Sequence, residues 1–554
     1  MSKRMFNRRK FLALSATVGV AAVSACAAPA APAEPPKAVE PTSAPAPAAA
    51  GSPTGIQFQG SGGLVLPVVK EPIKLNAFST PLYAPAKDVK TLGEQIYFRE
   101  AGKRTGVTFD WQMAGEADEN PIDLLMASGD LPDLFVGITP LQAVDYGQQG
   151  ALAPLNDLIE KYCPNFSKAL KENPVLKGQL VAPDGNIYFF PRLLLEATTR
   201  NFSGFIIRQD WLDKVGMKIP DTTDELYEVL KAFKKEDPNR YPLTFTPTPL
   251  IWAFGVGGAG GANNTDFYRV DPQVKYAPTE VAYGEGLDYI NKLFKEGLID
   301  PEYLTTITKS ELLKERWLKG ISGVQFGYAG SHLSAFSTAI KEAQPEARLV
   351  AMLSPKGPRG ERENLSVHNV IDPGQGASIS AKSQNKEALA QFIDYIYSPE
   401  GSLLYFWGLE GDTFNFDKEG VPQYTDKVTK NAQKLSVGEW VWNYISPTWF
   451  GPMNYLGIAY LQSVTAAAAD GLRLWSTGQY KQKLPVLSFT KEETDVIKTK
   501  MTDINTLLTE KRAKWINGEE SISSLPDFSK QVKDVGLPDV LKVQQAAYDR
   551  FLKA

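Results

Sequence analysis

Strand-like and helix-like patterns alternate in the first part of the chain, and this alternation constrains the fold more than any other feature. Apolar runs typical of strands lie at residues 73–78, 107–111 and 134–136. Helical segments, each followed by a glycine within two residues, lie between them at 95–104 and 122–128. Strands that alternate with helices at this rate predict a parallel sheet covered by helices, the α/β class.

The loops that follow these strands are the first candidates for a functional site. Ligands of parallel α/β sheets bind beyond the carboxyl ends of the strands. Gly137, Ile138 and Thr139 come directly after the third predicted strand, and Tyr83 lies in the loop after the first. We therefore expect these four residues to line a binding site.

A second set of elements is readable between residues 184 and 239. Two apolar, aromatic-rich runs at 187–190 and 205–207 favour strands. Thr222 lies three residues before Glu225, which predicts a capping box at the start of a helix. The apolar residues that follow recur at spacings of three and four, so the helix has one apolar face, and Pro238 ends it.

The N-terminus has the features of an export signal followed by a tether. Residues 1–25 combine a basic start with an apolar run too short to span a bilayer, and small residues precede Cys26 as in a lipobox. Arg8 and Arg9 resemble a twin-arginine export motif, although arginine pairs also occur in ordinary signal sequences. Residues 26–64 are rich in Ala and Pro, which predicts an extended spacer. We expect lipidation at Cys26; the alternative is a plain secretory cleavage site.

Charge and cysteine content bear on the expected partners and on disulfide formation. The 554 residues carry 59 Lys and Arg against 63 Asp and Glu, a net charge of −4, which gives no electrostatic reason to expect nucleic acid or an anionic membrane surface as partner. There are 2 cysteines, so with Cys26 lipidated Cys163 has no partner and no disulfide is expected. We expect Cys163 to be a small buried thiol.

Several stretches resemble the lipoprotein branch of family 1 of the extracellular solute-binding proteins. Residues 184–188 read DGNIY and residues 207–217 read IRQDWLDKVGM, followed by Pro220, Thr222 and Glu225 as in that family. Further matching stretches lie at 126–133, 150–159, 297–302 and 398–411, so that the resemblance covers about residues 70 to 554.

The resemblance implies a periplasmic-binding-protein fold: two α/β lobes joined by a hinge, with the ligand held in an interlobe cleft. On this basis we assign residues 65–190 and about 376–445 to lobe one. Residues 191–375 and about 446–554 then form lobe two, with crossings near residues 190–191 and 372–376.

The sequence contains no motif for metal-dependent or nucleophilic catalysis. The patterns HExxH, CxxC and GxSxG are absent, and the two histidines, His332 and His368, are far apart in the sequence. Many relatives in the family carry an acidic, calcium-like loop after the Asp-Pro-Asn at 237–239; here Arg240 follows, and the alternating oxygen ligands are missing. We expect no metal and no cofactor. Two suitably placed carboxylates would suffice for a glycoside hydrolase, so that alternative stays open.

Aromatic residues are the stronger indication of a ligand. An indole or phenol ring can cover the apolar face of a sugar, while buried hydroxyls need a few polar partners. The alternative for each aromatic ring is a place in the core. The candidates for ligand contact are the aromatic Trp252, Tyr328, Trp407 and Trp449, with Tyr83, and the polar Arg192 and Glu410.

These observations together predict a solute-binding lipoprotein of an ABC importer rather than an enzyme. The expected partners are an oligosaccharide or related sugar, the transmembrane permease subunits, and the membrane through the lipid anchor only. We expect a monomer, located outside the cytoplasm on the cell membrane. An anchored polysaccharide-degrading enzyme and a ligand-sensing partner of a membrane receptor are the alternatives.

Overall fold

A computed structural model describes the chain from residue 58 onward with short gaps, and residues 56–554 form one compact unit. Cys26 and the predicted signal and tether up to residue 57 lie outside the described residues, as do Tyr83 and Trp449. Among the described residues, no helix has the length and apolar character that a membrane span requires. The described ranges are 58–80, 89–114, 120–245, 247–257, 266–308, 310–364, 367–447, 451–478 and 482–553.

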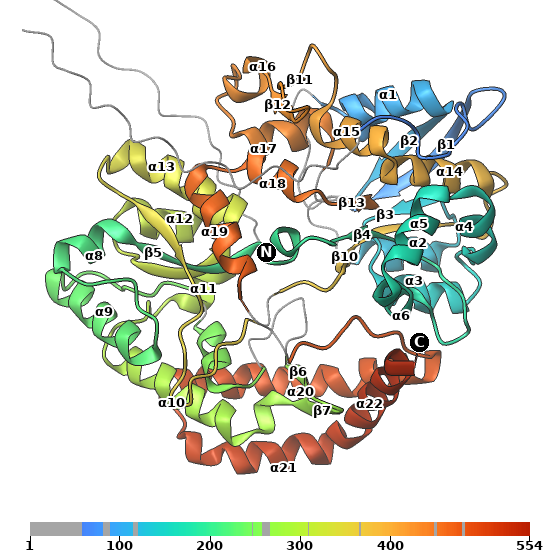
Figure 1. Ribbon diagram of the computed structural model, residues 1–554. Coiled ribbons are helices and arrows are strands. Elements are labelled where there is room, and N and C mark those ends of the chain that lie inside the picture. The colour runs from blue at the N-terminus through green and yellow to red at the C-terminus, as the bar shows by residue number, and fades with distance from the viewer. Residues whose placement is uncertain are drawn as a thin grey trace, which may run out of the picture. The chain divides into compact units, whose positions relative to one another are not determined.

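The alternating segments form the parallel part of a six-stranded sheet (Figure 1). Strand β1 (Ile73–Ser79) pairs in parallel with β2 (Val107–Met113) and with β3 (Leu134–Val136), which confirms the three predicted strands. Helices α1 (Ile96–Thr105) and α2 (Pro121–Ser128) connect them, as predicted. The next helices in this half are α3 (Pro140–Gln148), α4 (Asn156–Tyr162), α5 (Pro164–Glu172) and α6 (Pro174–Leu180).

Three further strands complete the sheet from distant parts of the chain. Strand β10 (Ile371–Ile379) lies antiparallel between β3 and β4 (Phe190–Leu193), and β13 (Met453–Asn454) lies parallel to β4. The order is β13-β4-β10-β3-β1-β2. Residues 453–454 thus belong to the first sheet, although the sequence placed everything after about 446 in lobe two; a two-residue strand leaves no readable pattern.

Helix α14 (Lys386–Tyr397) packs against α4 and α5 beside this sheet. Cys163, between α4 and α5, is fully buried, and its thiol lies 3.5 Å from the carbonyl oxygen of Ala390. This confirms the prediction of a small buried thiol, and burial raises the pKa of Cys163.

The second sheet has three antiparallel strands. Strand β5 (Ser203–Arg208) lies between β8 (Val324–Tyr328) and β9 (Leu349–Met352). Helix α9 (Thr223–Glu236) packs on α8 (Gln209–Val215). The predicted capping box of α9 is present, with the Glu225 amide donating to the Thr222 hydroxyl at 3.1 Å. The remaining helices here are α7 (Ala197–Arg200), η2 (Thr248–Phe254), α11 (Tyr303–Thr308), α12 (Ser310–Leu318), the π-helical turn η4 (Ala329–Ser334) and α13 (Ala335–Ala343).

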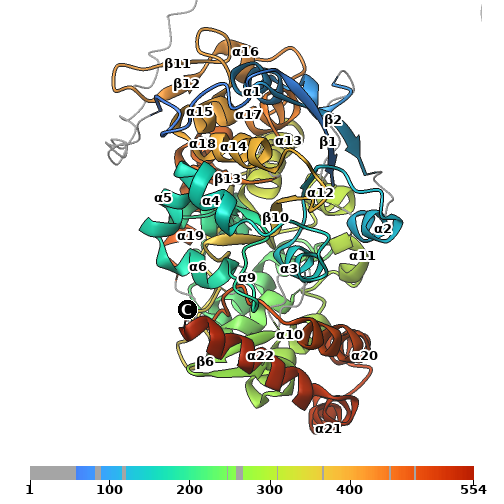
Figure 2. The ribbon, with the colours of Figure 1, turned by 90° about the vertical axis from the view of Figure 1, so that its right-hand side faces the viewer.

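A group of long helices forms a second hydrophobic cluster with parts of this half. Helix α20 (Lys491–Asn517) lies beside α10 (Val281–Lys295), and α21 (Leu525–Val535) and α22 (Leu537–Lys553) pack against α20, as Figures 1 and 2 show. The hairpin of β6 (Phe267–Val270) and β7 (Gln273–Tyr276) packs on α22.

The segment between α14 and α20 contains short elements and supplies β13 to the first sheet. It then passes to the second sheet, where α19 packs on β9. Its elements are α15 (Pro399–Trp407), β11 (Phe414–Phe416), β12 (Pro422–Tyr424), α16 (Asp426–Thr429), α17 (Val437–Trp440), η5 (Val441–Ile445), α18 (Gly457–Ser463) and α19 (Ala466–Ser476).

Candidate functional site

The strands that connect the two sheets carry a buried ion pair. Strand β4 leads from the first sheet through α7 to β5, and β10 returns after β9. Arg192 on β4 pairs with Asp372 on β10, with side chains only 4% and 5% exposed. Burial lowers the pKa of Arg192 to about 10. A buried charge is costly without a counter-charge, so each of these two groups needs the other. The pair therefore links β4 to β10 where the chain passes between the sheets.

His368 lies next to this pair. Its ring stacks on Phe202 with centroids 4.3 Å apart, and its Nδ1 lies 3.7 Å from the Asp372 carboxylate. That distance is too long for a hydrogen bond, and Nδ1 has no hydrogen-bond partner among the described residues. Burial, and then the positive charges of Lys483 and Arg192, hold the pKa of His368 well below its usual value, so the imidazole is neutral at pH 7.

Tyr328, at the end of β8, presents an aromatic ring beside the same residues. It is 48% exposed, and its ring lies 5.9 Å from Phe202 and 5.8 Å from His332. His332 Nδ1 accepts the Tyr328 backbone N–H at 3.1 Å, and burial lowers the pKa of His332 to about 4. A neutral histidine in the π-helical turn η4 thus supports one side of Tyr328, while much of the tyrosine stays accessible to a ligand.

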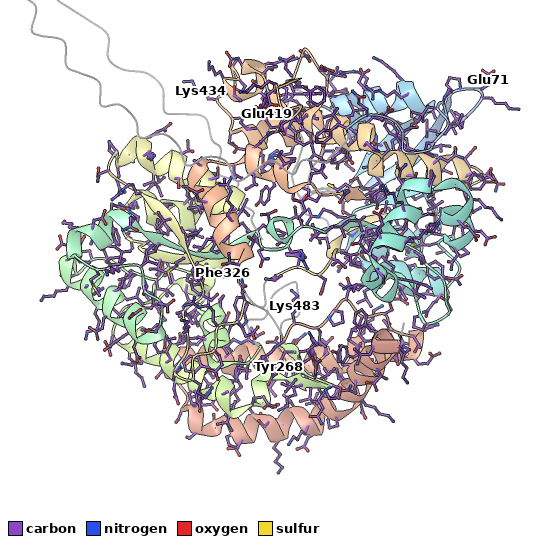
Figure 3. The ribbon with its side chains drawn as sticks, viewed as in Figure 1. Glu71, Tyr268, Phe326, Glu419, Lys434 and Lys483 are labelled. Atoms are coloured by element: carbon purple, nitrogen blue, oxygen red, sulfur yellow. The ribbon has the colours of Figure 1, made fainter. Side chains whose placement is uncertain are left out.

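Lys483 lies in the segment between α19 and α20 (Figure 3), and its charge acts on His368. Arg269 Nε donates to the Lys483 carbonyl at 3.0 Å, and the Asn369 amide donates to the Leu484 carbonyl at 3.3 Å. These bonds hold the backbone after Lys483 near Asn369, the residue that follows His368. Burial lowers the pKa of the Lys483 ammonium to about 7.

Two tyrosines connect these groups. The Arg192 guanidinium lies 5.5 Å from the centroid of the Tyr455 ring, and Tyr455 contacts Tyr460, whose ring contacts Phe202. We call the whole set the crossing cluster; it consists of Arg192, Phe202, Tyr328, His368, Asp372, Tyr455, Tyr460 and Lys483.

Arg192 and Tyr328 are the two predicted site residues that the structure brings together. The other members of the crossing cluster were not among the candidates. His368 and Asp372 stood out in the sequence only as a histidine without a motif partner and as part of a predicted crossing. Lys483 and the tyrosines gave no signal, because their contacts join segments that are remote in the sequence.

The loop after β3, predicted to line the site, is held to β10 by a backbone hydrogen bond, and its side chains are engaged elsewhere. Gly137 has φ of +86°, and a Cβ there would lie 1.9 Å from the Thr80 hydroxyl, so only glycine fits. Its N–H donates to the Gly376 carbonyl on β10 at 2.8 Å. Ile138 is fully buried, and Thr139 caps α3 through Gln142. The Ile138 side chain therefore belongs to the core, and the Thr139 side chain is engaged at the helix start.

Trp252 and Trp407 occupy core positions, which argues against their predicted stacking on a ligand. Trp252 is 2% exposed and packs against Phe326, with centroids 5.5 Å apart. Trp407 is fully buried against Phe58, and its Nε1 donates to the Gln462 side chain at 2.8 Å. A ligand could reach neither ring without displacing these neighbours. A tryptophan in a glycine-rich or helical stretch looks the same in sequence whether it is buried or exposed.

Glu410 is exposed, and its backbone bridges to Phe414. No described contact connects it to the crossing cluster.

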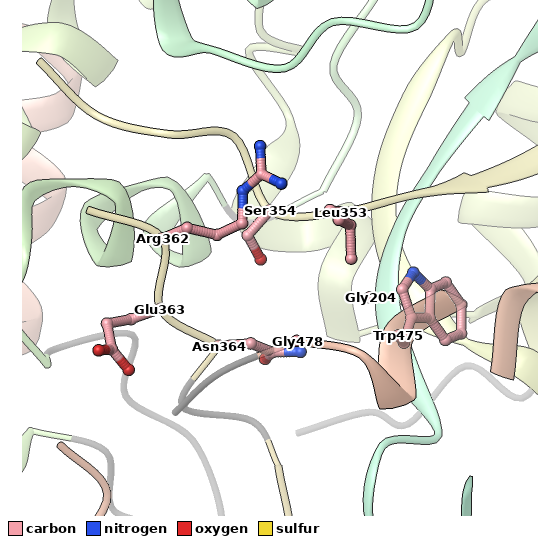
Figure 4. A pocket seen from close by; sticks show the side chains of 8 residues that line it. All are labelled: Gly204, Leu353, Ser354, Arg362, Glu363, Asn364, Trp475 and Gly478. Carbon is pink, nitrogen blue, oxygen red and sulfur yellow. The ribbon is translucent and has the colours of Figure 1, made fainter. Parts of the chain in front are cut away.

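A separate hollow lies beside β5 (Figure 4). The space between its walls is about 280 Å³, open solvent included. Trp475 closes it by packing against Gly204, with its Nε1 donating to the Met352 carbonyl at 3.0 Å. Its lining is Gly204, Leu353, Ser354, Arg362, Glu363, Asn364, Trp475 and Gly478.

The turn after α9 is occupied by an arginine. The Arg240 guanidinium donates to the Phe233 carbonyl at 3.4 Å, lies 3.8 Å from the Asp237 carboxylate and stacks over Trp211. Elsewhere in the described part of the chain, no three His, Cys, Asp or Glu side chains are grouped so that they could hold a metal ion.

The two sheets, the strands that connect them and the cluster on those strands define a two-lobe α/β binding protein. Residues 81–402 match the bacterial extracellular solute-binding protein family, and the chain belongs to that family.

Among its relatives is the fructooligosaccharide ABC transporter substrate-binding protein FusA of Streptococcus pneumoniae, 28% identical over 87% of this chain and 91% of FusA. Lipoprotein LipO of Bacillus subtilis is 28% identical over 65% of this chain and 71% of LipO. The crystal structure of the alginate-binding protein AlgQ2 without calcium ion superposes with a TM-score of 0.73 at 27% identity, covering 87% of this chain and 99% of AlgQ2. FusA in complex with kestose gives a TM-score of 0.69 at 25% identity, covering 87% and 100%.

Proposed function

We propose that this protein captures an oligosaccharide and delivers it to the transmembrane subunits of an ABC importer. The observation that carries the proposal is that Tyr328 is 48% exposed and lies against Phe202, where the chain passes between the sheets. A sugar has an apolar face that a phenol ring can cover, and hydroxyls that need charged or polar partners. Tyr328 offers the apolar contact, whereas the Arg192 and Asp372 side chains, 4% and 5% exposed, are enclosed in the described arrangement.

The location of the cluster supports a binding protein that opens and closes. Strands β4 and β10 carry the ion pair and also connect the two sheets. A ligand that contacts Tyr328 on the second sheet and also contacts the first sheet would favour the arrangement in which both reach it. Such a ligand would shift the equilibrium from the open to the closed arrangement of the lobes, to the extent that it binds the closed one more tightly.

The relatives support a sugar but leave its chemistry open. FusA is named for fructooligosaccharides, whereas AlgQ2 is named for alginate. We propose an oligosaccharide as the ligand class for this chain.

The tether belongs to the same proposal. The lipobox-like residues before Cys26 and the Ala/Pro-rich spacer favour a lipid anchor that keeps the folded part outside the cytoplasm and near the permease. The similarity to lipoprotein LipO supports this. We propose that the protein is a monomer and contacts the membrane only through its lipid.

Calorimetry with a panel of neutral and acidic oligosaccharides tests this function, and product analysis of the same mixtures tests the alternatives. We expect saturable binding of at least one oligosaccharide and no cleavage after prolonged incubation. Product that accumulates linearly with time would indicate the anchored polysaccharide-degrading enzyme. Binding without cleavage, combined with normal uptake of the sugar in a strain lacking this protein, would instead favour the receptor partner.

A further inference from the structure

The lobes of the two sheets also touch each other through helices. Helix α20, which packs in one hydrophobic cluster with the second sheet, contacts α3 beside the first sheet, and α22 contacts α6 (Figures 1 and 2). These contacts lie apart from β4 and β10, the strands that carry the chain between the sheets. A movement that separates the lobes at this place therefore has to break them.

An ion pair joins α20 to α3. Lys498 Nζ lies 2.6 Å from Asp145 Oδ2. The Asp145 side chain is 11% exposed, and its other carboxylate oxygen accepts the Gln149 Nε2 amide at 2.8 Å. The carboxylate is thus held in place on α3, while Lys498, 60% exposed, reaches it from the other lobe.

The place of Asp145 within α3 makes this partner favourable. Asp145 lies in the last turn of the helix, where carbonyl groups without helical partners carry a partial negative charge. A carboxylate is disfavoured there unless a cation is near, and the last turn of α3 contains no basic residue. Lys498 supplies from the second lobe the positive charge that α3 lacks.

Two further contacts accompany the ion pair. Gln148 Nε2, at the end of α3, donates to the carbonyl of Phe489, just before α20, at 3.4 Å. On α6, a Cβ at Gly178 would lie 3.1 Å from the ring of Phe551, so the missing side chain lets the end of α22 come close. The Phe551 ring stacks on Tyr548 of the second hydrophobic cluster. The same two lobes are therefore in contact at three points.

We propose that Lys498 and Asp145 form a lobe clasp, which stabilises the closed arrangement and sets how often the ligand-free protein opens. An exposed ion pair contributes little free energy, which suits a contact that must break and re-form. Because the clasp supplies part of the free energy of closure, a ligand has to supply less, and its apparent affinity rises. Both residues act through the position of the lobes and are positioning residues.

The distance between the lobes tests the clasp in the absence of any ligand. Spin labels are attached at Lys168→Cys on α5 and Lys231→Cys on α9, whose side chains are 73% and 46% exposed. The full chain with Cys26→Ser is used, so that the remaining cysteine is the buried Cys163. Double electron–electron resonance then gives the distribution of distances between the two labels.

Charge reversal assigns the effect to this pair. Lys498→Gln should raise the ratio of open to closed protein about two- to five-fold, the range expected for an exposed pair. Lys498→Asp and Asp145→Lys place like charges opposite each other and should open the protein further. The double variant Asp145→Lys/Lys498→Asp restores opposite charges and should return the distribution to that of the wild type.

A matched control is available within one lobe. Lys161 is also 60% exposed and pairs with Asp157 of the same helix, α4, at 3.3 Å. Lys161→Asp makes the same change of charge without a partner across the lobes and should leave the distance distribution unchanged. Melting temperatures of all variants should stay close to that of the wild type, because the pair joins two folded lobes and belongs to the core of neither.

Three results would overturn the inference: an unchanged distribution in Lys498→Asp, a double variant that stays as open as the single ones, or a control that opens the protein equally. Should Lys498→Asp fail to fold, an unchanged distribution in Lys498→Gln decides against the clasp. High NaCl provides an independent check, since it screens an exposed pair and should open the wild type but not Lys498→Gln. Because no ligand is present, these outcomes do not depend on the proposed sugar binding.

Discussion

Replacing Tyr328 by alanine should remove the main apolar contact with the sugar. Tyr328 is 48% exposed, and an aromatic side chain buries ~150–250 Å² when it is fully covered, so ~70–120 Å² is available to a ligand. At ~25 cal/mol per Å² this area contributes ~2–3 kcal/mol to binding, which corresponds to a loss of roughly 30- to 150-fold in affinity. Calorimetric titration of wild type and Tyr328→Ala with the best-binding oligosaccharide measures the change.

Two further variants show whether this loss comes from the ring. Tyr328→Phe keeps the apolar face and should stay within a few-fold of wild type. Trp252→Ala removes a ring that is 2% exposed, so it should lower the free energy of unfolding by about 3–5 kcal/mol while the folded protein keeps its affinity. Unchanged affinity in Tyr328→Ala, or lost affinity with full stability in Trp252→Ala, would show that the ligand lies elsewhere.

Three other predictions concern anchoring, metal and pH. Cys26→Ser should move the protein from the membrane fraction to the medium, or to the periplasm where an outer membrane is present; unchanged fractionation would rule out the lipid anchor. EDTA and Ca²⁺ should leave the melting temperature unchanged, since the Arg240 guanidinium occupies the turn after α9, and a large loss in EDTA restored by Ca²⁺ would contradict this. His332 has a pKa lowered from 6.5 to about 4, so between these values the unfolded chain binds a proton that the folded protein does not, and stability falls with falling pH by up to about 1.4 kcal/mol per unit. His332→Gln should reduce this slope in urea unfolding at pH 4.5 to 6.5; an unaltered slope would mean that His332 is not buried neutral.

Local patterns were sufficient for the elements of the first sheet and for α9. The strands at 73–79, 107–113 and 134–136 and the capping box at Thr222 depend on neighbours within a few residues, and all are present in the structure. The three-stranded sheet around β5 was not foreseen as antiparallel, because its pairings join residues more than a hundred positions apart.

The site was less predictable for the same reason. Arg192 and Tyr328 were chosen for residue type and position, but their partners Asp372, His368 and Lys483 come from segments that no periodicity connects. Burial also determines which of the aromatic candidates a ligand can contact. Tyr328 is half exposed, whereas Trp252 and Trp407 are enclosed by other side chains. Composition cannot distinguish these cases, since it does not report which neighbours cover a ring.

The interleaved order of the first sheet has a consequence for how the chain becomes stable. β3 ends at Val136 and β4 begins at Phe190, yet the two do not pair with each other; both pair with β10, which ends at Ile379. During synthesis, β3 and β4 can therefore pair with their shared neighbour only after β10 has been made. The pairing of β4 with β13 also requires synthesis up to Met453. Until then the edges of both strands stay open to pairing with other chains. A truncation before Ile371 would leave the N-terminal half without its central strand, so this lobe cannot be produced as a simple N-terminal fragment.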